Sequence, residues 1–117
     1  MLSVLRKATI ALLLLLITFA FSLWLVDPVR SANSDFFTFW LAARLVLEGY
    51  NPYLTDIWVG GHHLYGATWI PNQTFIYPLP VALLFLPLGA LPLYWAYLLW
   101  VWILEGLILL SLCHLLK

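Results

Sequence analysis

This 117-residue sequence has few charges, a single cysteine and none of the short motifs that mark soluble nucleotide or zinc enzymes. Charged residues make up 9% of the chain, whereas soluble domains carry about 25%. The five basic and five acidic residues cancel, so the charge balance does not indicate a nucleic-acid partner. The lone Cys113 excludes a disulfide or a thiolate metal site within the chain. There is no Walker motif, Gly-x-Gly-x-x-Gly loop or His-Glu-x-x-His helix.

Apolar residues dominate the composition of the chain. They form 65% of the chain, and the mean hydropathy is +1.01. A soluble fold of this composition would expose far more contiguous apolar surface than monomers tolerate. The sequence therefore predicts an all-α integral membrane protein, organised as a single membrane domain over residues 1–117, with membrane lipids as its surroundings.

The first predicted span covers residues 8–26. About 19 residues at a rise of about 1.5 Å each give about 28 Å, close to the thickness of the hydrocarbon core. Arg6 and Lys7 precede it and predict a cytoplasmic N-terminus. A cleaved signal peptide is the alternative, but its apolar region would be shorter. Trp24 near the end of the run resembles an interfacial exit and favours a retained anchor.

Residues 27–77 are then expected on the non-cytoplasmic side. Asn33 or Ser34 can cap a helix over 34–48 that is apolar on most of its surface and suits the membrane interface. The rest of the segment interleaves tyrosine and tryptophan with glycine and proline, which is typical of a loop at headgroup level. One short helix is expected within it, around 54–66.

The final apolar stretch admits two arrangements. Because Pro92 interrupts it, we expect a short second membrane helix over 79–91, a tight turn and a third helix over 94–116. The alternative is one long kinked helix. The hairpin would leave Lys117 on the non-cytoplasmic side, which the positive-inside rule does not favour.

Two acidic residues are candidates for function. Asp35 lies where a helix N-terminus follows the first span, so it can serve either as a first-turn acid or as a general base for an attacking hydroxyl. Glu105 lies inside the last apolar run, where an acid costs about 2.5–3.5 kcal/mol to insert. We expect this buried acid to be protonated and to form an interhelical hydrogen bond.

The remaining polar candidates favour structural roles. Arg44 and Glu48 stand four residues apart and can pair along a helix, although Arg44 can instead bind a lipid phosphate. His62 and His63 are adjacent and point in different directions, so they cannot chelate one metal from a helix face. Coordination of a pigment by either histidine is disfavoured but left open, and no metal or cofactor is predicted.

Two longer blocks carry a family resemblance. Ser34–Tyr53 (SDFFTFWLAARLVLEGYNPY) and Phe75–Pro92 (FIYPLPVALLFLPLGALP) resemble the first external segment and second span of bacterial glycosyltransferases of family 87, in the GT-C superfamily. That group includes polyprenyl-phosphate-mannose-dependent mannosyltransferases. A small departure is Leu79, which stands between two prolines.

The resemblance implies a function. In such enzymes an acid in the first external loop acts as catalytic base, and Asp35 is the matching position. The donor would be a sugar on a polyprenyl phosphate, transferred at the non-cytoplasmic face of a bacterial-type plasma membrane in a multi-pass protein.

Length is the main departure from that family, whose members are much longer and have many more spans. The chain is therefore expected to be an N-terminal portion, one part of a split enzyme, or a relic reused as a small subunit. Either the remainder of the enzyme or other membrane subunits would be its partners. The alternative function is a non-catalytic accessory subunit of a photosynthetic or respiratory type of complex, packed against partner helices and lipids.

Overall fold

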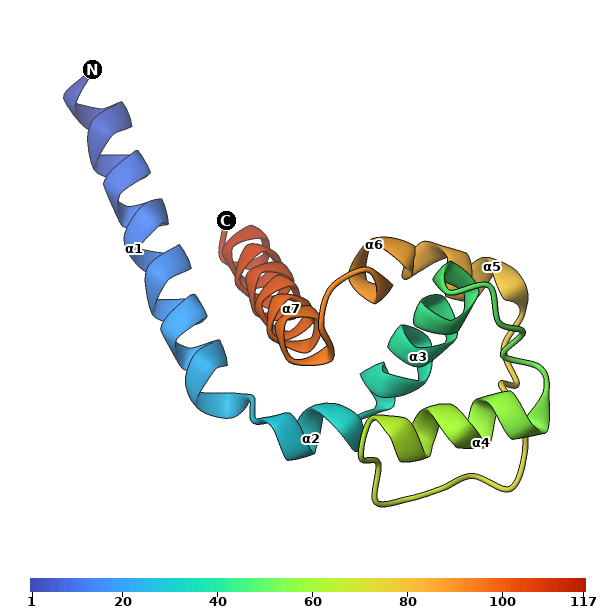
Figure 1. The fold of residues 1–117 in the computed structure, drawn as a ribbon. Helices are drawn as coiled ribbons and strands as arrows, with labels where there is room; N and C mark the ends of the chain where they lie inside the picture. The colour runs from blue at the N-terminus through green and yellow to red at the C-terminus, as the bar shows by residue number, and fades with distance from the viewer. The chain divides into compact units, whose positions relative to one another are not determined.

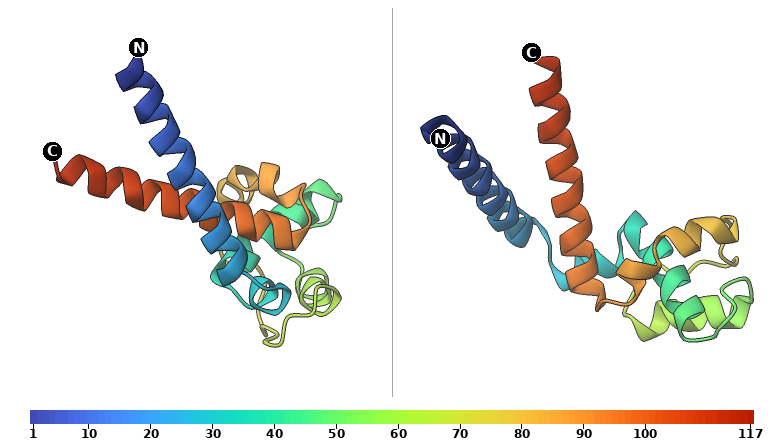
Figure 2. Two further views of the ribbon diagram at one scale, coloured as in Figure 1. Left: turned by 90° about the vertical axis from the view of Figure 1, so that its left-hand side faces the viewer. Right: turned by 90° about the horizontal axis from the view of Figure 1, so that it is seen from above.

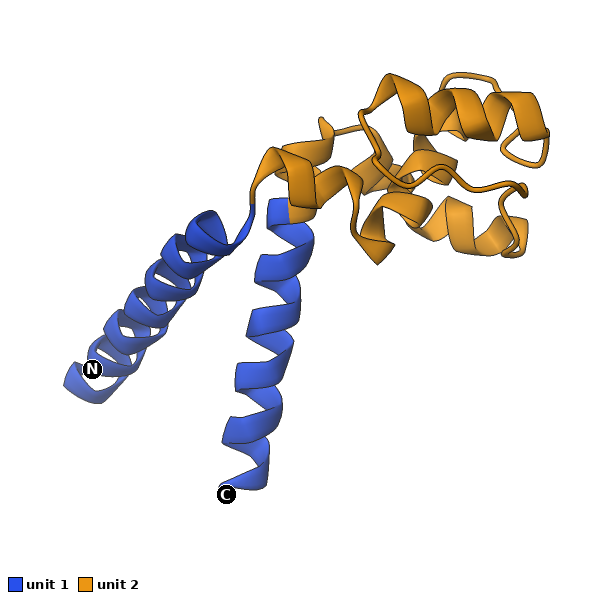
Figure 3. Cartoon of the chain, turned by 90° about the horizontal axis from the view of Figure 1, so that it is seen from below, with its two compact units in different colours: residues 1–26, 98–117 blue, residues 27–97 orange.

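The computed structural model describes residues 1–117 as helices joined by turns and loops, without a strand (Figure 1). The helices in chain order are α1 (Leu2–Leu25), α2 (Pro28–Ala32), α3 (Asp35–Leu47), α4 (Thr55–Leu64), α5 (Leu79–Leu84), α6 (Leu86–Gly89) and α7 (Leu93–Leu115). They divide into two compact units (Figure 3). The helix-pair unit comprises residues 1–26 and 98–117, and the central unit comprises residues 27–97.

Two helices, α1 and α7, are long and apolar enough to cross a membrane. They contain 24 and 23 residues and hardly any buried side chains, unlike the core helices of a soluble protein. At about 1.5 Å per residue each is about 35 Å long, enough for a hydrocarbon core of about 30 Å. These two helices indicate a helical membrane protein.

Polar contacts join the two helices of the helix-pair unit. The Trp102 Nε1–H donates to Thr18 Oγ1 at 3.0 Å, and Phe19 meets the Trp102 ring edge-on with centroids 5.2 Å apart. One helical turn further along α1, Ser22 Oγ lies 2.8 Å from Oε2 of Glu105. Small hydroxyl side chains are common at helix contacts in membranes because they let the backbones approach and supply hydrogen bonds.

The Ser22 hydroxyl faces two acceptors. It donates to Oε2 of Glu105 and also lies 2.9 Å from the carbonyl oxygen of Thr18. A hydroxyl has one proton, so the two acceptors share it. The other carboxyl oxygen, Oε1, is buried and has no hydrogen-bond partner.

The central unit is built around α3. Ser34 begins the helix, its Oγ accepting the Phe37 N–H at 3.3 Å. Gly49 ends it with a φ of +82°, and Tyr50 N–H then donates to the Leu45 carbonyl at 2.8 Å, a closure that suits glycine in the left-handed region. The helix is one residue shorter at each end than the predicted 34–48. Its buried side chains are Phe36, Phe37, Trp40, Leu41, Ala42, Ala43 and Leu45.

The segment after residue 78 differs from the predicted single short membrane helix over 79–91. It forms α5, with six residues, and α6, with four, and both pack against α3 (Figure 2). The break at Phe85 has a local cause, because the Pro87 ring would clash with the carbonyl of Leu83 if α5 continued. The alternative of one kinked helix over 79–116 also differs, since α7 begins anew at Leu93.

A glycine permits α6 to lie close to α3. A Cβ on Gly89 would stand 2.8 Å from the Ala43 Cβ and 3.0 Å from the Arg44 backbone nitrogen. The Trp40 Nε1–H reaches across the same contact and donates to the Leu91 carbonyl at 3.1 Å. Backbone proximity and a long-range hydrogen bond therefore fix the turn between α6 and α7 on α3.

We expect Gly89→Ala to destabilise the central unit by about 1–3 kcal/mol, because the added methyl group meets backbone that cannot move aside cheaply. Gly60→Ala on α4 is the matched control, since nothing lies within 4 Å of its new Cβ and alanine favours a helix. Thermal unfolding in mild detergent measures both variants. Equal stability of Gly89→Ala and the parent chain would contradict the close α3–α6 contact.

Candidate functional site

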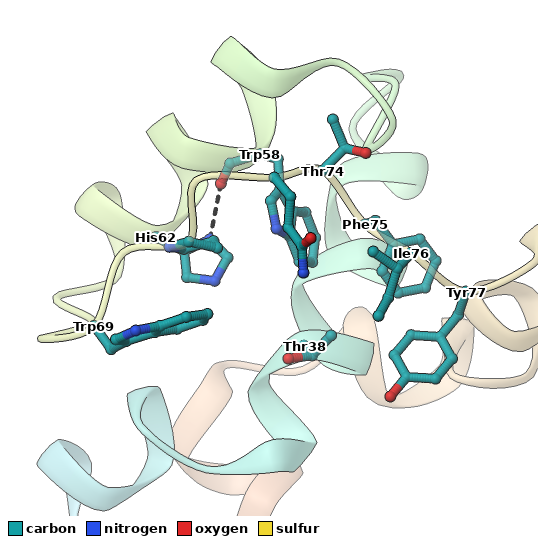
Figure 4. Close-up of a pocket in the computed structure, with 10 residues that line it drawn as sticks. Thr38, Trp58, His62, Trp69, Thr74, Phe75, Ile76 and Tyr77 are labelled. Atoms are coloured by element: carbon teal, nitrogen blue, oxygen red, sulfur yellow. Dashed lines mark hydrogen bonds between the residues drawn. The ribbon is translucent and has the colours of Figure 1, made fainter.

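Two adjoining hollows open on the central unit and share Thr38, His62 and Trp69 in their walls. The aromatic hollow, of about 150 Å³, is completed mainly by the loop that follows α4 (Figure 4). The acidic hollow, of about 250 Å³, is completed by the start of α3 and includes Asp35. The shared residues come from α3, α4 and the following loop, so the site exists only when these three segments are packed together.

Asp35 lies in the first turn of α3, with its side chain exposed in the acidic hollow. Ser34 supplies the cap hydrogen bond, so the Asp35 carboxylate is not used for that purpose and accepts no hydrogen bond from the chain. The aligned peptide dipoles at a helix N-terminus favour a carboxylate there. Its oxygens are thus open to a ligand.

Asn33 ties the loop after α4 to the start of α3. Its Oδ1 accepts from the backbone N–H of Thr68 at 2.8 Å and from the Thr68 hydroxyl at 2.7 Å, while its amide nitrogen donates to the Val29 carbonyl at 2.8 Å. These bonds hold the residue that follows, Trp69, beside the acidic hollow. The Trp69 side chain remains 70% exposed, so its indole face is available.

His62 lies at the junction of the two hollows and is buried between Phe37 and Trp58, whose rings stand 5.2 and 4.9 Å from it. Its Nδ1 lies 2.8 Å from the Trp58 carbonyl oxygen. Nδ1 must carry the proton to make this bond, which leaves Nε2 as an acceptor. Figure 4 shows the second ring nitrogen directed toward the hollow.

Burial away from water lowers the pKa of His62 below its ordinary value near 6.5, although its hydrogen bond to Trp58 acts in the opposite direction. The imidazole is therefore neutral at pH 7. His63, the next residue, lies exposed outside the site. No group of three or more His, Cys, Asp or Glu side chains is placed to hold a metal ion.

Arg44 lies near the other end of α3 and does not line either hollow. Its Nε donates to Glu48 Oε1 at 2.7 Å, and its Nη1 donates to the Gly89 carbonyl at 3.2 Å. The hydrogen bond to Glu48 is the main reason why the pKa of Arg44 is raised. Arg44 therefore joins α3 to α6 and does not accompany Asp35, and Glu105 belongs to the helix-pair unit.

Sequence reasoning singled out Asp35 but did not find Thr38, Trp69 or the Asn33–Thr68 tie. Thr38 stands one turn after Asp35 on α3, and this helical spacing was the signal that could have placed the two side chains on one face. Thr68 and Trp69 reach the site by way of the loop after α4, which no local sequence pattern places.

Chemically, the hollows suit a neutral ligand that carries hydroxyl groups. Asp35 and the Nε2 of His62 can accept hydrogen bonds, the Thr38 hydroxyl can donate or accept, and the Trp69 face can stack against a ring. About 250 Å³ holds a group of the size of one small ring and little more.

No family model, curated protein or solved structure matches this chain.

The central unit is expected to lose stability as the pH falls. Below about pH 6.5 the unfolded chain binds a proton at His62 that the folded chain resists, so the free energy of unfolding declines from there toward the lowered pKa of the folded state. Thermal unfolding between about pH 7.5 and about pH 5 measures this slope. His62→Gln should flatten it, and His63→Gln should leave it unchanged. A slope that persists in His62→Gln would assign the effect to another group.

Proposed function

We propose that this chain forms part of a membrane-bound glycosyltransferase of the GT-C kind, in which Asp35 is the general base toward an acceptor hydroxyl. The observation that carries the proposal is the open carboxylate of Asp35 in a hollow with hydrogen-bonding and aromatic walls. The likeness of residues 34–53 and 75–92 to family 87 enzymes supports the same assignment for this residue.

The proposed reaction uses few groups of this chain. The acceptor oxygen forms a bond to the anomeric carbon of the sugar while Asp35 takes the hydroxyl proton. The bond from that carbon to the polyprenyl phosphate oxygen breaks, and the phosphate leaves with the electron pair, so the sugar is transferred with inversion. Trp69 would support the acceptor by stacking, and the neutral His62 would accept a hydrogen bond from it.

The proposed setting is a bacterial-type plasma membrane, with the N-terminus in the cytoplasm beside Arg6 and Lys7 and residues 27–77 on the other side. The acceptor would meet the lipid-linked donor there, where no nucleotide sugar is needed. The helices α1 and α7 leave nearly all their side chains uncovered, so they cannot alone enclose a polyprenyl chain. Further membrane helices, from the remainder of an enzyme or from partner subunits, would complete the donor site.

An accessory, non-catalytic subunit is the second candidate, and a groove in the helix-pair unit favours it. The groove has about 250 Å³, is lined by Ile17, Phe21 and Ile108, and contains Glu105. Oxygen Oε1 of Glu105 lacks a donor within the chain. A polar side chain of a partner helix could approach this groove, as expected in a photosynthetic or respiratory type of complex.

Asp35→Asn is expected to lower sugar transfer by about a hundredfold or more, because the amide cannot take the proton. The substitution is made in the native gene, and isolated membranes receive a labelled polyprenyl-phosphate sugar. Asp56→Asn is the matched control, since Asp56 is also an exposed acid in the first turn of a central-unit helix. It should retain full transfer.

Unchanged transfer in Asp35→Asn would rule out the enzymatic proposal. Native purification of the same variant then tests the second candidate. Migration of the chain in a larger complex, with transfer unchanged, would support an accessory subunit, whereas migration alone would remove the accessory proposal.

A further inference from the structure

We propose that the α5–α6 segment, residues 78–92, lies in the non-cytoplasmic leaflet with lipid against its outer face, and that it enters and leaves the membrane on the same side. The segment would be a membrane-embedded wedge and not a crossing. The wedge would be a lipid-binding surface that sets the topology of the chain, whether or not the chain takes part in glycosyl transfer.

The outer face of the wedge is apolar throughout. Leu84 is 78% exposed, and Leu79 and Leu83 are each nearly half exposed, while Ala82 and Gly89 turn inward to α3. Between Asp56 and Glu105 the sequence contains no aspartate, glutamate, lysine or arginine. A surface of this kind in water would be an aggregation liability, whereas hydrocarbon covers it without loss of hydrogen bonds.

Side chains of α3, and not water, satisfy two backbone carbonyl groups of the wedge. The turn that follows α6 leaves carbonyl groups without helical partners, and two of these receive donors from α3. Trp40 Nε1–H donates to Leu91 at 3.1 Å, and Arg44 Nη1 donates to Gly89 at 3.2 Å. Irregular backbone is tolerated at membrane depth when protein groups satisfy it in this way.

Proline removes unpaired N–H donors at the starts of α5 and α6. Both α5 and α6 have proline in the first turn, where the N–H groups of a helix otherwise lack partners. Pro80 and Pro87 therefore leave fewer backbone groups that need water.

The wedge is too short to cross, and its connection to α7 fixes its depth. The six and four residues of α5 and α6 give about 9 and about 6 Å of helix. The next helix, α7, starts at Leu93 with Tyr94 and the half-exposed Trp95, the residue types that gather at the membrane surface. The wedge therefore joins α7 at the level of the headgroups.

The topology follows from this placement. The chain crosses the membrane only through α1 and α7, so both termini lie on the same side. Lys117 then shares the cytoplasm with Arg6 and Lys7, and the conflict between the hairpin arrangement and the positive-inside rule disappears.

Cysteine labelling tests the topology in the full chain, with Cys113→Ser as background. Lys117→Cys should react with a membrane-impermeant maleimide only after cells are permeabilised, as should Ser3→Cys. Asn72→Cys, on an exposed loop of the central unit, should react in intact cells. Labelling of Lys117→Cys on the same side as Asn72→Cys would mean that the wedge crosses, and would overturn the proposal.

A second measurement tests the lipid contact. A fluorophore on Leu84→Cys should be quenched strongly by phospholipids with brominated acyl chains and only weakly by iodide in water. His63→Cys, on the exposed side of α4, is the control and should show the reverse. Leu83→Cys provides an independent label on the same face. Quenching of Leu84→Cys by iodide, or protection from both quenchers, would overturn lipid as the occupant.

Discussion

The packing of α6 against α3 is the contact on which the central unit depends. It requires a glycine at position 89, where a side chain would meet the Ala43 methyl group and the Arg44 backbone. The same contact brings Trp40 and Arg44 within hydrogen-bonding distance of the turn that leads into α7. Because α3 is buried on this side by α5 and α6 and also packs against α4, its N-terminal turn is held in place. One helix thus supports both the apolar wedge and the hollow that contains Asp35.

The polar groups of the chain divide into structural and open sets. Arg44 and Glu48 satisfy each other and the end of α6. Ser22 and Glu105 join the two apolar helices α1 and α7 through one hydrogen bond. The carboxylate of Asp35, by contrast, has no partner within the chain. The proposal of a catalytic base rests on this contrast and on the place of Asp35 in the acidic hollow.

Local signals in the sequence predicted a large part of the fold. The capping residue Ser34 and the glycine at position 49 set the ends of α3, and long apolar runs marked α1 and α7. The break at Phe85 was missed because Leu79–Leu91 reads as one apolar run, and the clash that Pro87 would cause acts on a carbonyl four residues earlier. Asp35 could be singled out because a helix start is a local feature. The walls around it could not, because Thr38, His62 and Trp69 come together only through packing, as do Ser22 and Glu105, 83 positions apart.

Hydrogen exchange in the lipid-reconstituted full chain tests most directly whether α3 organises residues 27–97. We predict that amides of α3 exchange more slowly than those of α2 and α4. Trp40→Phe, which removes the donor to Leu91, should speed exchange in residues 86–93 while α4 is unaffected. Exchange of α3 as fast as that of α2, or no response of residues 86–93 to Trp40→Phe, would contradict this role of α3.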